Sequence, residues 1–206
     1  MARHGAALET TAAEVRRGGG RAWSFPLDVS SDIDPAELRD RLQTEGDGLD
    51  ILVHSAGTHA AGPIADAPVA QLDEHYRVNV RGPYVLTQLL LPLLQARRGQ
   101  IVFVNSSVGL QARARVGGYA ASKHALKALA DALRDEVNPD GVRVRSVYPG
   151  RTATPAQAAI YAEEGKPYRP ERLMQPEDVA AVVVHALTVK RTAEVTDISI
   201  RPLQKA

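Results

Sequence analysis

The sequence predicts a single α/β domain in which helices cover both faces of a parallel sheet. Three observations lead to this prediction. Short β-branched runs alternate with helical spacing along the 206 residues. The clearest run, "LDILVHSAG", is apolar in the manner of a buried parallel strand. Neither a repeat nor a low-complexity linker interrupts the alternation. Residues 1–206 are therefore expected to form one domain of βαβ units.

The N-terminal part is predicted to contain a helix, a strand, a helix and a second strand. Helical spacing ends at "GGG" (18–20), and "AWSFPLDV" then reads as a short strand ending near Asp28. Asp34 and Pro35 suit the N-cap and the first turn of the next helix. The run "LDILVHSAG" follows as a buried strand that leads into a turn at Gly57.

The C-terminal part continues the alternation. Residues 68–97 read as one or two helices, "QIVFVNSS" as a strand, "GYAASKHALKALADALRDEV" as a long helix and "GVRVRSVYPG" as a strand. Pro176 begins a further helix, and "EVTDISI" is the last strand. The segment from Thr152 to Leu173 is polar and contains Tyr161 and Tyr168, so it is predicted to be an irregular loop over a site.

Composition excludes several classes of function. A formal net charge of +1 predicts no nucleic-acid partner. The most apolar run, Tyr84 to Gln95, is shorter than the roughly 20 residues that a spanning helix needs, so no membrane segment is expected. The absence of cysteine rules out disulfides and thiolate metal sites, and the six histidines lack metal-ligand spacing. With no secretory signal at the N-terminus, the predicted location is the cytoplasm.

Tyr119 and Lys123 carry the clearest chemical signal. Positions i and i+4 share one face of a helix, so both side chains can point into one pocket. A phenol has a reference pKa of about 10, and a nearby ammonium lowers that value. The pair can therefore move a proton to or from an alcohol oxygen. Ser106 stands at the carboxyl end of a predicted strand, where open α/β sheets bind ligands, and can hold that oxygen.

Each of these residues also has an ordinary structural reading. Tyr119 alone is a half-buried helix aromatic, Lys123 a solvated charge and Ser106 a turn residue. Arg113 and Arg115 in "QARARVGG" suggest an anionic ligand, but two arginines in a loop are usually a solvated surface. For Tyr119, Lys123 and Ser106, the order of the motifs along the chain favours the catalytic reading over the structural one.

Taken together, these residues resemble the short-chain dehydrogenase/reductase family, whose signature is a strand-end serine followed by Tyr-x-x-x-Lys. The segment "LDVSSD" resembles the family's strand-end Asp-Val, "HSAG" its Asn-Asn-Ala-Gly, "VNVRGPY" its helix asparagine and "YPGRTAT" its Pro-Gly-x-x-x-Thr turn. The resemblance extends through nearly the whole chain. The residues that it implies at the cofactor are Asp28, Val29, Ala56, Gly57, Tyr119, Lys123, Pro149, Gly150 and Thr152, with Thr154 as a further candidate.

The resemblance implies a catalytic set of Asn79, Ser106, Tyr119 and Lys123. Tyr119 would donate or accept the proton, Ser106 would hydrogen-bond the substrate oxygen, and Lys123 would bind the nicotinamide ribose. Asn79 would hold a proton-relay water. Ser107 competes with Ser106, but a spacing of thirteen residues to the tyrosine is commoner in the family and favours Ser106. The implied cofactor is NADP, with NAD as the alternative, and the implied substrate is a small alcohol or carbonyl compound.

The sequence departs from the family at its start. The family's first strand and Thr-Gly-x-x-x-Gly-x-Gly turn have no counterpart in residues 1–206, because "GGG" precedes a strand instead of following one. The expected fold is thus a Rossmann-like doubly wound sheet that is incomplete at the N-terminus, with the first two strands missing. Arg3 stands where the family often binds the 2′-phosphate of NADP.

Two functions follow from these observations. The first is an NAD(P)-dependent oxidoreductase that interconverts an alcohol and a carbonyl. The alternative is a truncated family remnant that binds no dinucleotide and is an interaction module or inactive. The resemblance also implies a homodimer or homotetramer formed through the helices near residues 81–97 and 118–137.

Overall fold

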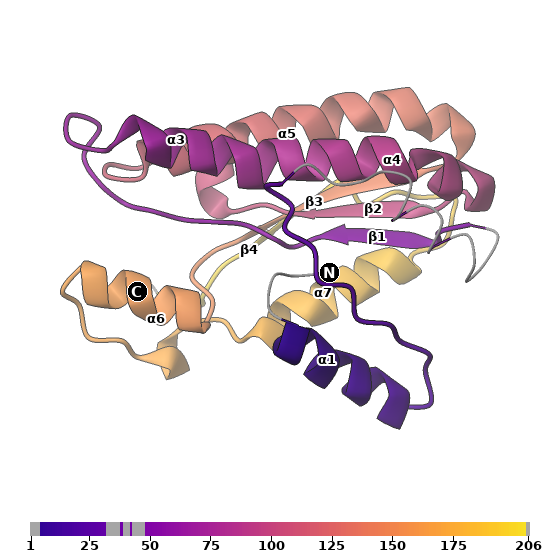
Figure 1. Ribbon diagram of the computed structural model, residues 1–206, viewed down its shortest axis with the longest axis horizontal. Coiled ribbons are helices and arrows are strands. Elements are labelled where there is room, and N and C mark those ends of the chain that lie inside the picture. The colour runs from indigo at the N-terminus through magenta and orange to yellow at the C-terminus, as the bar shows by residue number, and fades with distance from the viewer. Residues whose placement is uncertain (1–4, 32–37, 39–41, 43–47, 205–206) are drawn as a thin grey trace.

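The computed structural model describes residues 5–31, 38, 42 and 48–204. Figure 1 shows a layered α/β arrangement, with a parallel sheet between two groups of helices. Strands β1 (Ile51–His54), β2 (Gln100–Val104), β3 (Arg143–Pro149) and β4 (Asp197–Ile200) pair in the order β1-β2-β3-β4. All three pairings are parallel. The predicted parallel α/β architecture is therefore confirmed.

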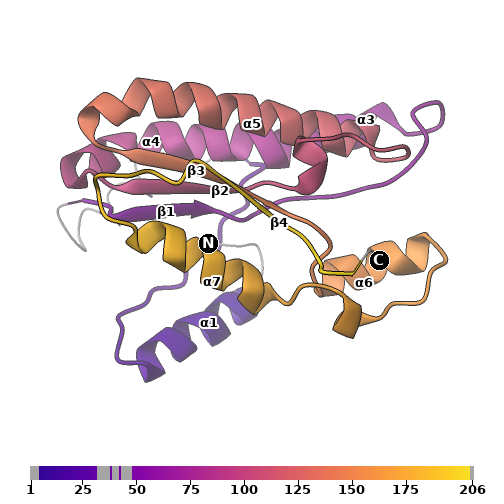
Figure 2. The ribbon, with the colours of Figure 1, turned by 180° about the vertical axis from the view of Figure 1, so that it is seen from behind.

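The helices lie on both faces of this sheet, as the alternating pattern predicts. Helices α3 (Val69–Tyr76), α4 (Gly82–Arg97) and α5 (Gly117–Val137) cover one face, and a π-helical turn at 77–81 joins the first two. Helix α7 (Pro176–Thr188) lies on the opposite face, with α1 (Gly5–Arg17) beyond it, and Figure 2 shows the same layers from behind. The helix predicted to begin at Asp34 lies outside the described residues, apart from Leu38 and Leu42.

The main core fills the space between the sheet and helices α4 and α5. Leucines at helical spacing on α4 meet the inward-facing residues of β1, β2 and β3, which alternate with period two along each strand. Burial of these side chains removes apolar surface from water and holds both helices on the sheet. The buried members are Leu52, Leu90, Leu94, Ile101, Phe103, Leu126, Ala130, Val137, Val142 and Val144.

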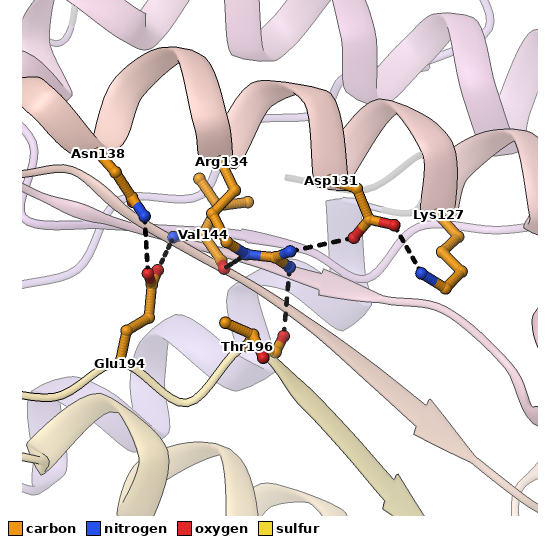
Figure 3. A network of polar contacts seen from close by, with 7 residues as sticks. All are labelled: Lys127, Asp131, Arg134, Asn138, Val144, Glu194 and Thr196. Atoms are coloured by element: carbon orange, nitrogen blue, oxygen red, sulfur yellow. Dashed lines mark hydrogen bonds and ion pairs between the residues drawn. The ribbon is translucent and has the colours of Figure 1, made fainter.

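A polar network ties α5 to the strands below it (Figure 3). Arg134 on α5 donates from Nε to the Val144 carbonyl at 2.8 Å and from Nη2 to the Thr196 carbonyl at 3.4 Å. Its Nη1 atom binds Asp131 at 3.0 Å. Glu194 accepts from the Val144 amide at 2.7 Å and from Asn138 at 2.9 Å. These bonds set the position of α5 along β3 and link both elements to the segment that leads into β4.

The segment "AWSFPLDV" differs from its prediction. It contains no extended strand, and only Pro26 has a bridge-like backbone pairing. Phe25 and Leu27 instead pack against a small cluster around Leu86 on α4. A strand needs a partner strand for its backbone hydrogen bonds, and in the described sheet β1 pairs with β2 alone. The apolar side chains of this segment therefore pack against helix α4, and its backbone does not join the sheet.

Two further predictions need correction. Strand β1 was expected to be buried on both faces, but Ile51 and Val53 are 42% and 46% exposed while Leu52 and His54 are buried. The described helices cover only one face of this edge strand. The segment from Thr152 to Leu173 was expected to be irregular, but it contains helix α6 (Pro155–Glu163). The signal was present in the sequence, because a threonine N-cap followed by proline is a helix start.

The buried His54 predicts a specific loss of stability in acid. Its Nε2 lies 2.9 Å from the Thr87 hydroxyl, its ring stacks on Phe103, and burial lowers the pKa of His54 to about 4. Because the unfolded pKa is about 6.5, the neutral ring stabilises the fold above that pH, and this contribution falls as the pH drops toward 4. We expect a loss of about 3 kcal/mol in the free energy of unfolding, measured by urea denaturation at pH 7 and pH 4.

The variant His54→Gln tests this assignment, because glutamine keeps a polar atom near Thr87 but does not titrate. It should lose less stability than the wild type between pH 7 and pH 4, whatever its stability at pH 7. The exposed His185 on α7 offers the matched control, since His185→Gln should leave the wild-type difference unchanged. An equal acid-induced loss in His54→Gln and in the wild type would contradict the prediction.

Candidate active site

A pocket of about 800 Å³ opens at the carboxyl ends of the parallel strands. Its wall includes Ser55 after β1, Ser106 after β2 and Gly150 after β3. Helix α5 contributes Tyr119 and Lys123, and α6 forms the outer side. In parallel sheets all strands end on the same edge, so loops that are far apart in sequence meet there. The pocket thus joins the segments that carry the predicted catalytic residues.

Lys123 lies at the base of this pocket with its charge almost withdrawn from water. The residue is 3% exposed, and its Nζ donates to the Val104 carbonyl at 3.2 Å. The Nζ atom lies 5.9 Å from the centre of the Tyr119 ring. Burial disfavours the charged form and lowers the pKa of Lys123 to about 8. The ammonium therefore predominates at neutral pH and loses its proton in mildly alkaline solution.

Tyr119 has a pKa above its ordinary value, which differs from the prediction made from the Tyr-Lys spacing. Burial of the phenol raises the pKa, and a hydrogen bond with the Ser106 side chain lowers it in part. The ammonium of Lys123, 5.9 Å from the centre of the ring, does not offset the effect of burial. In this structure Tyr119 consequently keeps its proton at neutral pH.

Ser106 lies at the start of the short 3₁₀ turn Ser107–Gly109, directly after β2. Its hydroxyl accepts from the Val108 amide at 3.4 Å and also contacts Tyr119. The neighbouring Asn105 fixes this turn, because its Oδ1 accepts from the Ser106 amide at 2.9 Å and its Nδ2 donates to the Lys123 carbonyl at 3.0 Å. Sequence reasoning missed Asn105, although it stands directly before the serine in "VNSS".

Asn79 is fully buried in the π-helical turn and clamps the loop that follows β1. Its Oδ1 accepts from the Thr58 amide at 2.9 Å, and its Nδ2 donates to the Thr58 carbonyl at 3.0 Å and to the Ser122 hydroxyl at 3.0 Å. The clamp needs a close approach at Gly57, where a Cβ would lie 3.3 Å from Asn79 Oδ1. Both amide hydrogens are used in these bonds, which leaves one lone pair of Oδ1 for a further partner.

Two histidines surround Tyr119, and no sequence motif pointed to them. The His59 ring meets the Tyr119 ring edge-on at 4.8 Å between centroids, and His75 on α3 lies 5.9 Å away. Burial lowers the pKa of both histidines. Nδ1 of His75 is buried without a hydrogen-bond partner in the structure. Both histidine rings therefore pack against the ring of Tyr119.

The predicted site residues separate into two groups. The pocket wall contains Gly57, Ser106, Ser107, Tyr119, Lys123, Pro149, Gly150, Thr152 and Thr154. Asn79 lies behind this wall through its bonds to Thr58. Asp28, Val29 and Ala56 do not line the pocket. Asp28 binds Ser30, and Val29 packs against Gly82 at the start of α4. Their contact with an adenine stays a prediction, and Arg3 lies outside the described residues.

The described residues contain no cluster of three or more groups that could hold a metal ion. The same part of the chain has no helix long and apolar enough to cross a membrane. The Ser106 and Tyr119 hydroxyls and the Lys123 amine belong to residues that line the same pocket.

Comparisons with known proteins agree with this geometry. A cyclopentanol dehydrogenase of Comamonas sp. is 35% identical over 149 residues, covering 72% of this chain and 60% of the relative. The chain thus matches less than two thirds of that protein's length. An uncharacterised oxidoreductase of Staphylococcus aureus is 30% identical over 179 residues, covering 86% of this chain and 75% of the relative.

Solved structures show the same arrangement. An alcohol dehydrogenase from Thermococcus sibiricus, complexed with 5-hydroxy-NADP, superposes with a TM-score of 0.86 at 25% identity, covering 100% of this chain and 86% of that one. A putative short chain dehydrogenase from Escherichia coli, complexed with NADPH, gives 0.87 at 29% identity, covering 96% and 82%. The family model described as short chain dehydrogenase matches residues 1–165. This chain therefore belongs to the short-chain dehydrogenase family.

Proposed function

We propose that the protein reduces a small carbonyl compound to an alcohol, and catalyses the reverse oxidation, with NADP as cofactor. The observation that carries the proposal is the meeting of Ser106, Tyr119 and Lys123 on the wall of one pocket at the carboxyl end of the sheet. Family membership and the NADP-type ligands of the similar structures support a nicotinamide dinucleotide.

In this proposal Tyr119 is the acid of the reduction. The raised pKa keeps its hydroxyl protonated at neutral pH, so it can donate a proton to the carbonyl oxygen. Ser106, whose side chain contacts Tyr119, holds the same oxygen by a hydrogen bond. The cofactor, when bound, supplies a hydride to the carbonyl carbon. Hydride and proton together convert the carbonyl to an alcohol, and Tyr119 is left as a phenolate that must regain its proton.

Lys123 fits the role of a ribose-binding residue. Among the described residues the Val104 carbonyl is the single acceptor of its Nζ, which leaves donors of the ammonium free toward the pocket. Its positive charge also stabilises the phenolate that Tyr119 becomes after proton transfer. Asn79 holds Gly57 and Thr58 in place, and the free lone pair of its Oδ1 is the proposed point for a relay water.

Assembly and location extend the proposal. An open groove lies across α3, the turn before α4, α4 and α5. Its apolar lining is Tyr76, Val80, Tyr84 and Leu129, with Asp73, Arg77 and Arg81 beside them, and it supports a homodimer or homotetramer. A cytoplasmic location agrees with the similarity to dehydrogenases but stays a prediction.

The alternative function is an interaction module that binds no dinucleotide. The Thr-Gly-x-x-x-Gly-x-Gly turn expected at a pyrophosphate is not in the sequence. We therefore expect residues 1–206, tested as an isolated chain, to bind NADPH more weakly than micromolar. Titration of NADPH fluorescence with the purified chain measures this affinity. Tight binding would show that this turn is dispensable and would count against the alternative.

The variant Tyr119→Phe tests the proposed acid. Phenylalanine keeps the ring contacts with His59 and His75 but removes the hydroxyl. Carbonyl reduction by the purified protein should fall by roughly 10² to 10⁴ in rate, with thermal unfolding little changed. The control is Trp23→Phe, at an exposed aromatic residue that does not line the pocket, which should keep wild-type turnover. Undiminished turnover in folded Tyr119→Phe would refute the assignment.

The variant Lys123→Met tests the charge at the base of the pocket. The wild type loses its ammonium as the pH rises through about 8, so reduction should decline over that range. Methionine removes this titration, and the raised pKa of Tyr119 then sets the decline. We expect a higher KM for NADPH, a lower rate and an alkaline midpoint at higher pH. The pH dependence of kcat is the measurement.

The matched control for this experiment is Lys127→Met, one turn further along α5. Lys127 forms a partly exposed ion pair with Asp131 at 2.5 Å and does not line the pocket. Its loss should leave the pH profile unchanged. If the midpoint in Lys123→Met equals that of the wild type, another group carries the alkaline titration and the role given to Lys123 is wrong.

A further inference from the structure

The pocket wall is cationic beyond what the proposed reaction requires. Five cationic side chains and two carboxylates line it, in a chain whose formal net charge is only +1. The seven are Arg113, Arg115, Lys123, Arg151, Lys166, Glu163 and Glu164. A concave site with an excess of one charge concentrates ligands of the opposite charge. The ion pairs within this wall show which of the cationic side chains remain available to bind a ligand.

Glu164 is already committed to two of the cations. Arg151 donates from Nη2 to both Glu164 oxygens at 2.7 and 2.9 Å, and Lys166 binds the same carboxylate at 2.8 Å. The Arg151 guanidinium also lies over the Tyr161 ring at 4.5 Å. These contacts join α6 to the turn after β3, so Arg151 and Lys166 are explained as structural residues of the pocket's outer side.

Arg113 and Arg115 have no such partner. Both side chains are exposed in the pocket wall, and neither forms an ion pair or a side-chain hydrogen bond with the described residues. Glu163 is the single wall carboxylate outside the Glu164 group. Two arginines of the pocket wall therefore carry guanidinium donors that no described residue uses, and each can bind one carboxylate or phosphate through two parallel hydrogen bonds.

The backbone holds this pair in place at a cost. Arg115 has φ of 68°, in the left-handed region that side chains other than glycine rarely adopt. Its carbonyl accepts a 2.7 Å hydrogen bond from the amide of Gly62, in the loop that follows β1. Backbone strain of this kind persists only where surrounding contacts maintain it. Here the hydrogen bond from Gly62 joins the arginine segment to the loop that follows β1.

We propose that the substrate is a carbonyl compound with an anionic group, a carboxylate or a phosphate, bound by Arg113 and Arg115. This inference rests on the proposed function, because it places the substrate carbonyl at Tyr119 and Ser106. Apolar side chains of Val108, Val116 and Ile160 line the same pocket and suit the carbon skeleton between the two ends. The anion-binding arginines thus determine specificity, while the hydroxyl pair performs the chemistry.

Paired substrates test the proposal with the purified protein. Levulinate is compared with methyl levulinate, and dihydroxyacetone phosphate with dihydroxyacetone, so that each pair differs in the anionic group alone. The wild type should favour one or both anionic members by kcat/KM, and the favoured pair identifies the anion. In Arg113→Gln/Arg115→Gln this preference should fall roughly tenfold to a hundredfold, mainly through KM. The control is Arg17→Gln on α1, whose exposed side chain lies outside the pocket and should leave the ratio unchanged.

A binding experiment separates this proposal from the reaction itself. Succinate should raise the thermal midpoint of the wild type more than dimethyl succinate does, and the double variant should lose that difference. If neither carbonyl pair is reduced, arginine-dependent succinate binding supports the anion site and counts against the reductase. If neither succinate nor inorganic phosphate binds, the anion site is refuted as well.

Three results would overturn the proposal. The first is a wild type with no preference for the anionic members of either pair. The second is a preference that survives loss of both arginines. The third is a rise in the KM for NADPH in the double variant with an unchanged substrate preference, which would show that the arginines bind phosphates of the cofactor.

Discussion

The packing of α5 across β2 and β3 is the constraint on which the candidate site depends. Tyr119 and Lys123 come from the start of this helix, whereas Ser106 comes from the end of β2. Their relative positions are set by the apolar core beneath α5 and by Arg134, which binds the backbone before β4 and on β3. Asn105 adds a direct link from the serine turn to the Lys123 carbonyl. A shift of the helix along the sheet would separate the hydroxyls.

Burial gives the site its electrostatic character. Withdrawal from water lowers the pKa of Lys123 and raises that of Tyr119, so each group is moved toward its neutral form. The two effects move the pKa values of the pair apart, so the Tyr119 phenol holds its proton more firmly than the Lys123 ammonium does. His54 at the end of β1 obeys the same rule, although it serves the core and not the pocket.

Short polar ties connect the loops around the pocket. Asn79 holds the Gly57–Thr58 segment, Gly62 binds the carbonyl of Arg115, and Arg151 binds Glu164 on the far side of α6. These contacts join segments that are far apart in the sequence at the same edge of the sheet. The wall is therefore built by tertiary contacts between loops at the carboxyl edge of the parallel sheet.

The sequence by itself determined the parallel α/β architecture, the helix bounds near α5 and α7, and the Tyr119/Lys123 face, because periodicity and i, i+4 spacing are local properties. It did not determine whether "AWSFPLDV" is a strand, since strand formation depends on a neighbouring strand elsewhere in the chain. It also left the direction of the Tyr119 pKa wrong, because desolvation depends on which segments cover the ring. His59, His75 and the unpaired arginines became part of the site only through the meeting of loops at the carboxyl edge of the sheet. Such meetings are long-range contacts, and no local pattern encodes them.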